Sequence, residues 1–149
     1  MKIVATNRRA KFDYEVSERL IAGIVLSGAE VKSVKQGHIS LRGSYVTLTN
    51  DELYLLNTHI SPYKYAGAKA FEPTRSRKLL VHKQEIARLA GLKQSGLALV
   101  PLAVGLERSL IKIEIGVGRG RKRGDKREVV KKRQAKREIA RAVARQRKT

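Results

Sequence analysis

The residues with the clearest chemical potential are the arginines and lysines of residues 118–133, GRGRKRGDKREVVKKR. No hydrophobic core can accommodate so many cations, whereas phosphate groups can neutralise them. Residues 119–149 contain 15 Lys or Arg and 3 Asp or Glu, and the whole chain of 149 residues carries a formal charge of +20. The excess is concentrated in the tail but extends into the rest of the chain. It predicts a polyanionic partner, and nucleic acid is the leading candidate.

Residue patterns typical of catalysis are missing from the sequence. The three histidines, His38, His59 and His82, are scattered and show neither metal-ligand nor acid–base spacing. The alternating glycines of residues 116–120 lack the Gly-Lys-Ser/Thr ending of a phosphate loop, so they are interpreted as a strand end and a loose junction to the tail. The chain has no cysteine, which excludes disulfides and thiol catalysis. We expect no enzymatic activity, no metal and no cofactor.

The elements that must position the cations are mostly strands. Residues 14–26 are strand-like, and Gly23 within them indicates a bulge or a close backbone approach. Residues 44–49 and 53–60 are expected to form a hairpin around an Asn50-Asp51 turn, because Asn and Asp tolerate the backbone angles of tight turns.

Two further strands are expected before the basic tail. The apolar run of residues 97–104 is one of them, and Pro101 must lie there at a sheet edge or a bulge because it lacks an N–H. In residues 109–117, Ile111, Ile113 and Ile115 alternate with polar residues or glycine. This period of two predicts a strand with one face in the core and the other in water.

Helical signals are fewer. Ser27 and Glu30 have the spacing of a capping box, and the short helix that follows is expected to end at Gly37. A second helix is expected from Leu79 to about Lys93, from its period of apolar residues. Two helices cannot cover both faces of a parallel sheet.

The fold class expected is mainly β with short helices: an oligonucleotide-binding-type antiparallel barrel of about six strands, flanking helices and a basic C-terminal tail. Residues 1–12 are expected to be a basic N-terminal arm, residues 13–118 the barrel domain and residues 119–149 the tail. The segment 61–78, with two prolines and five basic side chains, is expected to be a long loop.

The tail has a weak helical pattern. Glu128 lies four residues before Lys132, and Ala135, Ile139 and Val143 recur every four residues. This apolar stripe is too narrow to hold a helix against the surrounding charge. We expect a segment that is disordered when free and helical when phosphates neutralise it; the alternative is a solvated tail with nonspecific RNA affinity.

Several segments together resemble one known family. They are GAEVKSVKQG (28–37), NDELYLLNTHISPY (50–63), PTRSRKLLVHKQEI (73–86), LALVPL (97–102) and GRKRGDKRE (120–128). These segments are similar to those of the SsrA-binding proteins, also called small protein B, the bacterial partners of transfer-messenger RNA in trans-translation. The resemblance runs in register from about Asn7 to Glu128, and later residues match by composition alone.

The resemblance implies the same barrel type with flanking helices, and binding without catalysis. It implies that the barrel binds the tRNA-like domain of transfer-messenger RNA and accompanies it, with elongation factor Tu, to ribosomes stalled on truncated messages. The protein is then expected to fill the space where codon and anticodon pair. Its basic tail is expected to enter the empty message channel and fold there as a helix against ribosomal RNA.

Position by position, the resemblance implies an RNA-facing set. Two members have a structural alternative, since the capping box explains Glu30 and the core explains Leu80 equally well. Arginine offers phosphate a planar fork, and lysine a point charge. The RNA-facing set is Asn7, Arg8, Glu30, Lys32, Arg75, Arg77, Lys78, Leu80, Lys112 and Lys122.

A second set belongs to the tail and is expected to contact the ribosome. Its members share a position in the cationic helix or in the Asp-Lys-Arg motif that opens it. They are Asp125, Lys126, Arg127, Lys131, Lys132, Arg133, Lys136 and Arg137.

The sequence departs from the family pattern at three places. Ile21 stands where most relatives place an acid, Phe71-Glu72 where His-Asp is usual, and Gly124 where a larger side chain is usual. Each departure predicts an altered contact. Tyr63 and Tyr65 offer stacking surfaces for unpaired bases, although packing against their loop is the alternative.

A different function remains open at this point: a structural ribosomal protein with a basic extension has the same composition. The longest apolar runs, residues 21–26 and 97–104, are far shorter than a membrane span, and no signal segment is apparent. A cytoplasmic monomer without a membrane partner is therefore expected.

Overall fold

The computed structural model describes residues 1–62, 72–121 and 123–147 and, within the last helix, the side chains of residue 127 and residues 130–142. The strands are β1 (Lys2–Thr6), β2 (Tyr14–Ile24), β3 (Ile39–Ser40), β4 (Tyr45–Thr49), β5 (Glu52–Leu56), β6 (His59–Ile60), β7 (Arg77–Leu80), β8 (Ala98–Glu107) and β9 (Leu110–Gly120). The helices are α1 (Arg8–Asp13), α2 (Gly28–Lys35), α3 (Lys83–Gln94) and α4 (Arg123–Arg147).

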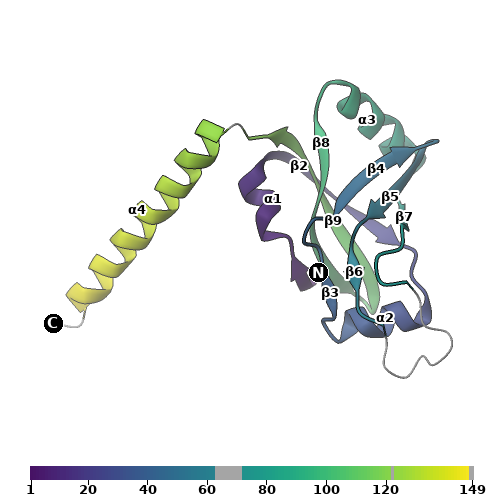
Figure 1. The fold of residues 1–149 in the computed structure, drawn as a ribbon, viewed down its shortest axis with the longest axis horizontal. Helices are drawn as coiled ribbons and strands as arrows, with labels where there is room; N and C mark the ends of the chain where they lie inside the picture. The colour runs from purple at the N-terminus through teal and green to yellow at the C-terminus, as the bar shows by residue number, and fades with distance from the viewer. Residues whose placement is uncertain (63–71, 122, 148–149) are drawn as a thin grey trace.

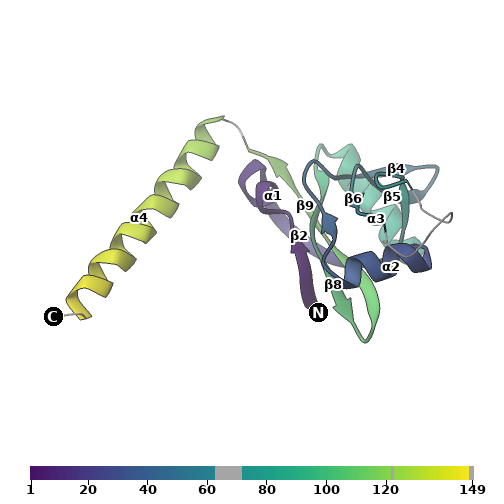
Figure 2. The same ribbon diagram turned by 60° about the horizontal axis from the view of Figure 1, so that its bottom comes forward.

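Most strands belong to one antiparallel sheet. Its seven strands follow the order β1-β8-β9-β2-β7-β5-β4, and β3 pairs with β6 in a separate two-stranded sheet. The large sheet curls so that β4, at one edge, lies against β8 without pairing with it (Figures 1 and 2). The mainly β fold with an oligonucleotide-binding-type arrangement is confirmed, but the barrel is not closed by hydrogen bonds.

The core is built from alternate residues of the long strands. Ile113 and Ile115 on β9 are fully buried, and Leu53 and Leu55 on β5 are buried opposite them in the same cluster. The polar residues between the isoleucines are half-buried. The expected strand at residues 109–117 is confirmed, because its period of two matches a sheet with one face in the core.

Tight local geometry appears where the sequence indicated it. Asn50 and Asp51 have φ angles of 50° and 60° and form the hairpin turn between β4 and β5. Pro101 lies at a register shift of β8, as its missing N–H requires. At Gly23 the register is regular, and a Cβ added there would lie 3.3 Å from the Leu80 Cβ, so the glycine marks a close approach and not a bulge.

The junction between the sheet and the tail is fixed by strand pairing and a backbone hydrogen bond. The glycines continue β9 to Gly120, and a Cβ added at Gly118 would lie 2.1 Å from the backbone oxygen of Glu15 on β2. Only glycine fits at this position. Directly after the strand, the Arg121 N–H donates to the Asp13 carbonyl at 2.7 Å. The loose junction expected from the glycines is therefore replaced by a fixed strand end.

Two expectations at the sequence level need correction. Residues 1–12 were expected to be an arm, but they form β1, which pairs with β8, and most of α1. Ile3, Val4 and Thr6 favour a strand locally, but the partners that β1 pairs with lie far along the chain on β8. The second helix begins at Lys83 and not at Leu79, because residues 77–80 form β7 with alternating buried and exposed residues.

The tail forms α4, which stands clear of the sheet in both views and begins near the end of β9 (Figures 1 and 2). Its helical form agrees with the pattern in the sequence, and the folding of a disordered tail on binding remains a prediction. No helix in the described ranges has the length and apolar character that crossing a membrane requires.

Candidate nucleic-acid interface

A buried ion network joins α2 to β7. The Glu30 side chain completes the expected capping box by accepting from the Ser27 N–H at 2.9 Å. Its second carboxylate oxygen, Oε2, accepts from Arg77 Nε at 2.6 Å. Arg75 donates to Oε1 from Nε at 3.1 Å and from Nη2. One carboxylate thus satisfies a helix N-terminus and two guanidinium groups.

Arg77 uses the rest of its guanidinium to hold backbone. Its Nη1 donates to the Thr58 carbonyl at 2.7 Å and its Nη2 to the Pro73 carbonyl at 3.0 Å. Both Arg77 and Glu30 are fully buried. The expectation that they touch RNA directly therefore needs correction: in this structure they fix the ends of residues 58–73, and only Arg75, 35% exposed, faces solvent.

The charges of this network support one another. Burial acts to raise the pKa of Glu30, but hydrogen bonds from Arg75, the Ser27 backbone and Arg77 outweigh it, and the pKa lies below its ordinary value of 4.5. Burial lowers the pKa of Arg77, and Glu30 acts against that change. An ion pair without solvent contact is retained only when both charges are fully hydrogen-bonded.

Two members of the expected RNA-facing set meet on the outer face of the sheet. Gly23 on β2 is opposite Leu80 on β7 and Lys112 on β9, and its missing side chain leaves a hollow between them. Leu80 is 52% exposed, so the core alternative for this residue is wrong. Ile21, 46% exposed, lines the same hollow. An apolar rim beside a lysine suits a ribose or base with its phosphate.

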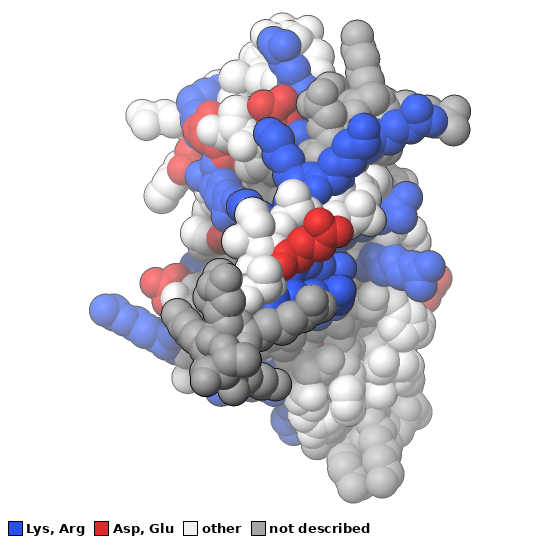
Figure 3. Space-filling model, turned by 90° about the vertical axis from the view of Figure 1, so that its left-hand side faces the viewer, with Lys and Arg blue, Asp and Glu red and all other residues white. Residues whose placement is uncertain are grey.

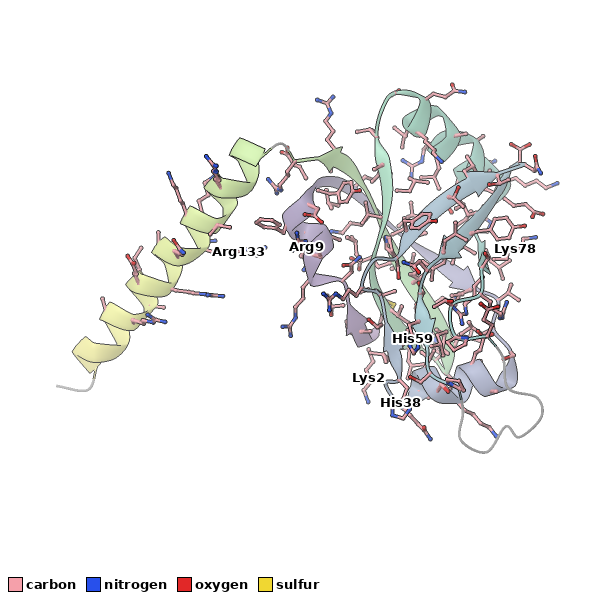
Figure 4. All side chains as sticks on the ribbon, in the orientation of Figure 1. Lys2, Arg9, His38, His59, Lys78 and Arg133 are labelled. Carbon is pink, nitrogen blue, oxygen red and sulfur yellow. The ribbon has the colours of Figure 1, made fainter. Side chains whose placement is uncertain are left out.

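Lys78 lies on the same outer face, two residues before Leu80 on β7. Its Nζ is 3.2 Å from Glu52 Oε1, and the Tyr54 hydroxyl donates to Oε2 of the same carboxylate. Both hydrogen bonds lower the pKa of Glu52, and the bond from Tyr54 has the larger effect. Figure 4 shows Lys78 on the side of the sheet away from α4. Its charge is therefore partly compensated before any RNA arrives.

Asn7 is a structural residue in this fold. It is buried, its Nδ2 donates to the Pro101 carbonyl at 2.9 Å, and its Oδ1 accepts from the Ala10 N–H at 3.3 Å. These bonds fix the start of α1 to the irregular part of β8. Direct RNA contact by the Asn7 side chain is replaced by a positioning role for its neighbour Arg8, which is exposed.

A groove missed at the sequence level lies beside Arg8. Residues 5–9 form one wall and residues 39–43 the other. Arg9 and Arg42 join Arg8 in lining it. Nothing in the sequence distinguished Arg42 from other basic residues, because the turn brings it to the N-terminal segment only in the folded chain.

The remaining members of the two expected sets are spread over the molecule. Lys32 is exposed on α2, whereas Lys122 and the tyrosines at 63 and 65 lie outside the described residues, as does Phe71. The backbone of residues 124–126 belongs to α4, and the side chains of these residues lie outside the description. Of the expected tail set, Arg127, Lys131, Lys132, Arg133, Lys136 and Arg137 are exposed.

Basic charge thus covers two separate parts of the molecule. Figure 3 shows Lys and Arg side chains over the face that includes α4, with acidic side chains between them. Figure 4 shows Arg133 on α4 and Lys78 at the far side of the sheet. Across the described part of the chain, no group of three or more His, Cys, Asp or Glu could hold a metal ion.

Known proteins resemble this chain over most of its length. The family model described as SmpB protein matches residues 4–145. The SsrA-binding protein of Acaryochloris marina is 48% identical over 146 residues, covering 97% of this chain and 95% of that protein. That of Chloroflexus aurantiacus is 49% identical over 148 residues, covering 97% and 92%. A chain of the solved structure "tmRNA-SmpB: a journey to the center of the bacterial ribosome" is 44% identical, with a TM-score of 0.65, and covers 84% of this chain and 92% of that chain.

Proposed function

The chain belongs to the SmpB protein family, and from this we propose that it is an RNA-binding factor of trans-translation. It binds the tRNA-like domain of transfer-messenger RNA and delivers it to stalled ribosomes, where the basic tail senses the empty message channel. The observation that carries the proposal is the family match over residues 4–145, with relatives called SsrA-binding proteins and a structural neighbour from a complex of tmRNA and the bacterial ribosome.

The outer face around Gly23 is the surface proposed for the tRNA-like domain. Leu80 and Ile21 supply exposed apolar contact, and Lys112 supplies a positive charge on the rim. Arg75 adds a guanidinium held by Glu30, so little conformational entropy is lost when it meets a phosphate. A rigid sheet that carries few but fixed groups recognises a folded RNA by its shape.

The tail is the part proposed to contact ribosomal RNA. Arg133 and Arg137 are one helical turn apart and exposed, and Lys136 lies beside them. Cations at this spacing follow a phosphate backbone when the segment is helical. Asp125, Lys126 and Arg127 open the helix, and they are proposed to lie nearest the decoding centre.

The protein is proposed to act as a cytoplasmic monomer, without catalysis, and to meet elongation factor Tu only within the delivery complex. A structural ribosomal protein is not favoured, because the family match covers nearly the whole chain. Washing ribosomes with high salt separates the two: a structural component stays bound, whereas a delivery factor leaves with transfer-messenger RNA.

The experiment that tests the proposal measures RNA binding of the full chain at physiological salt. We expect tighter binding to the isolated tRNA-like domain than to an unrelated hairpin of equal length. We also expect Lys112→Ala to weaken this binding, while Lys93→Ala, at an exposed position on α3, leaves it unchanged. Equal affinity of the wild-type chain for both RNAs would contradict the proposed function.

A further inference from the structure

The groove beside α1 has the form of a binding site. It measures about 820 Å³, within the range of pockets that hold small organic groups. Arg8 and Arg9 line one wall and Arg42 the other, and none of the lining residues is acidic. Ala5 and Ile39, both half-buried, contribute apolar surface between them. The groove shares no residue with the hollow at Gly23.

Both walls are held in place by hydrogen bonds. On the first, the buried Asn7 side chain connects the residue before Arg8 to the Pro101 carbonyl. On the second, Asn57 Nδ2 donates to the Gly43 carbonyl at 3.1 Å. Gly43 has a φ of +74°, a left-handed conformation that favours glycine and turns the chain directly after Arg42. The two arginines therefore project from fixed backbone, as a preformed site requires.

The three arginines are not equivalent. Arg9 is 3.4 Å from the Asp13 carboxylate, and its Cζ lies 5.6 Å from the centre of the Phe12 ring, so its charge is already engaged. Within the described part of the chain, the guanidinium groups of Arg8 and Arg42 have neither an ion pair nor a hydrogen-bond partner. Two unpaired guanidinium groups across one groove attract an anion, and their planar forks match the geometry of phosphate.

We propose that Arg8 and Arg42 bind one backbone phosphate of RNA in this groove, with the adjoining ribose or base against Ile39. It is a second RNA site, separate from the face around Gly23, and Arg42 is its specific residue. The inference rests on the proposed function for the choice of RNA as the ligand. The phosphate comes either from transfer-messenger RNA or from ribosomal RNA, and the test distinguishes these sources.

The test compares Arg42→Ala and Arg8→Ala in the full chain, with the isolated tRNA-like domain and with small ribosomal subunits as separate ligands. We expect each variant to lose on the order of tenfold in affinity for one ligand, as a charge-assisted hydrogen bond to phosphate requires. The slope of log affinity against log salt should fall by about 0.7 to 0.9. Because both residues hold one phosphate, the double variant should lose less than the product of the single losses.

Lys93→Ala is the matched control, since it removes one exposed positive charge far from the groove in sequence. Arg42→Lys keeps the charge without the planar fork and should recover only part of the affinity. Arg42 is exposed, and equal melting temperatures will show that the variants fold. Wild-type affinity of Arg42→Ala for both ligands would overturn the site, as would an equal loss in Lys93→Ala, which would indicate diffuse attraction.

Failure of the groove and failure of the proposed function give different results. Suppose that the wild-type chain prefers the tRNA-like domain and that Arg42→Ala binds each ligand with wild-type affinity. The proposed function then stands and the groove is rejected as an RNA site. If the wild-type chain shows no such preference but Arg42→Ala still loses affinity for an RNA, the groove stands and the function is rejected.

Discussion

Arg77 donates from Nε to Oε2 of Glu30 at 2.6 Å, and neither side chain has any exposed surface. The pair connects α2 to β7, and Arg77 also holds the carbonyls of Thr58 and Pro73. The resemblance to the SsrA-binding proteins implied an RNA-facing role for both, with the capping box as the alternative for Glu30. Their burial makes them instead the support for Arg75, the exposed member of the network.

Replacing Arg77 should lower the free energy of unfolding more than replacing an exposed arginine. Arg77→Met leaves a buried carboxylate short of a partner, and we expect the free energy of unfolding to fall by about 3–5 kcal/mol. Arg88→Met is the control, because it breaks an exposed ion pair with Glu18. The Arg88 side chain is 46% exposed and that of Glu18 is 37% exposed. We expect a loss of at most about 1 kcal/mol there. Urea denaturation measures both, and equal losses would show that burial does not govern the effect.

The pH dependence of stability should contain the signature of Glu30. Its pKa is lower in the folded chain than its ordinary value of 4.5. A carboxyl of this kind stabilises the fold above its unfolded pKa, and the stabilisation is lost as the pH falls through the folded pKa. The difference in unfolding free energy between wild type and Glu30→Gln should therefore be constant near neutral pH and shrink below about pH 4.5. Denaturation at a series of pH values checks this, and a constant difference down to about pH 2 would contradict it.

Two glycines should respond oppositely to alanine. At Gly118 a Cβ would lie 2.1 Å from the Glu15 carbonyl oxygen, so Gly118→Ala must separate β2 from β9 and should lower the melting temperature strongly. At Gly91, within α3, nothing lies within 4 Å of an added Cβ. Gly91→Ala should raise stability by about 0.5–1 kcal/mol, because alanine favours helix. Thermal unfolding compares them, and a neutral Gly118→Ala would show that the two strands can move apart.

Neighbouring leucines on β7 should separate stability from RNA binding. Leu79 is 2% exposed, and Leu79→Ala should cost about 2–5 kcal/mol of stability. Leu80 is 52% exposed, so Leu80→Ala should change stability little but weaken binding to the tRNA-like domain. Denaturation and RNA titration of the two variants provide the measurement. Unchanged RNA affinity in Leu80→Ala would remove this residue from the interface.

The helix content of the tail should depend on RNA. Repulsion among Arg133, Lys136 and Arg137 opposes α4 in water, and phosphates relieve it. We expect circular dichroism of the full chain to show a gain in helix on adding small ribosomal subunits, after the spectrum of the subunits is subtracted. Ala140→Gly, which lowers helix propensity without changing charge, should weaken this binding. No gain in helix with any RNA would reject folding on binding.

Local signals in the sequence determined several parts of the structure. The capping box at Ser27 and Glu30, the turn at Asn50-Asp51 and the alternation in residues 109–117 depend on neighbours within a few residues, and all three are present. The motifs shared with the SsrA-binding proteins also indicated the family. Charge concentration in the tail needed only a count of residues.

Only the tertiary structure decided which basic residues are available to RNA. Arg77 became a core residue because β7 places it against α2, and arginine is rarely buried without such a partner. Arg42 entered a groove because β3 and β4 bring its turn to the N-terminal strand. The arm expected at residues 1–12 became β1 and α1 because its hydrogen-bond partners lie about 100 residues away on β8. The spacing of residues in the sequence does not show such long-range contacts. These contacts decide which basic side chains are buried and which are exposed and available to RNA.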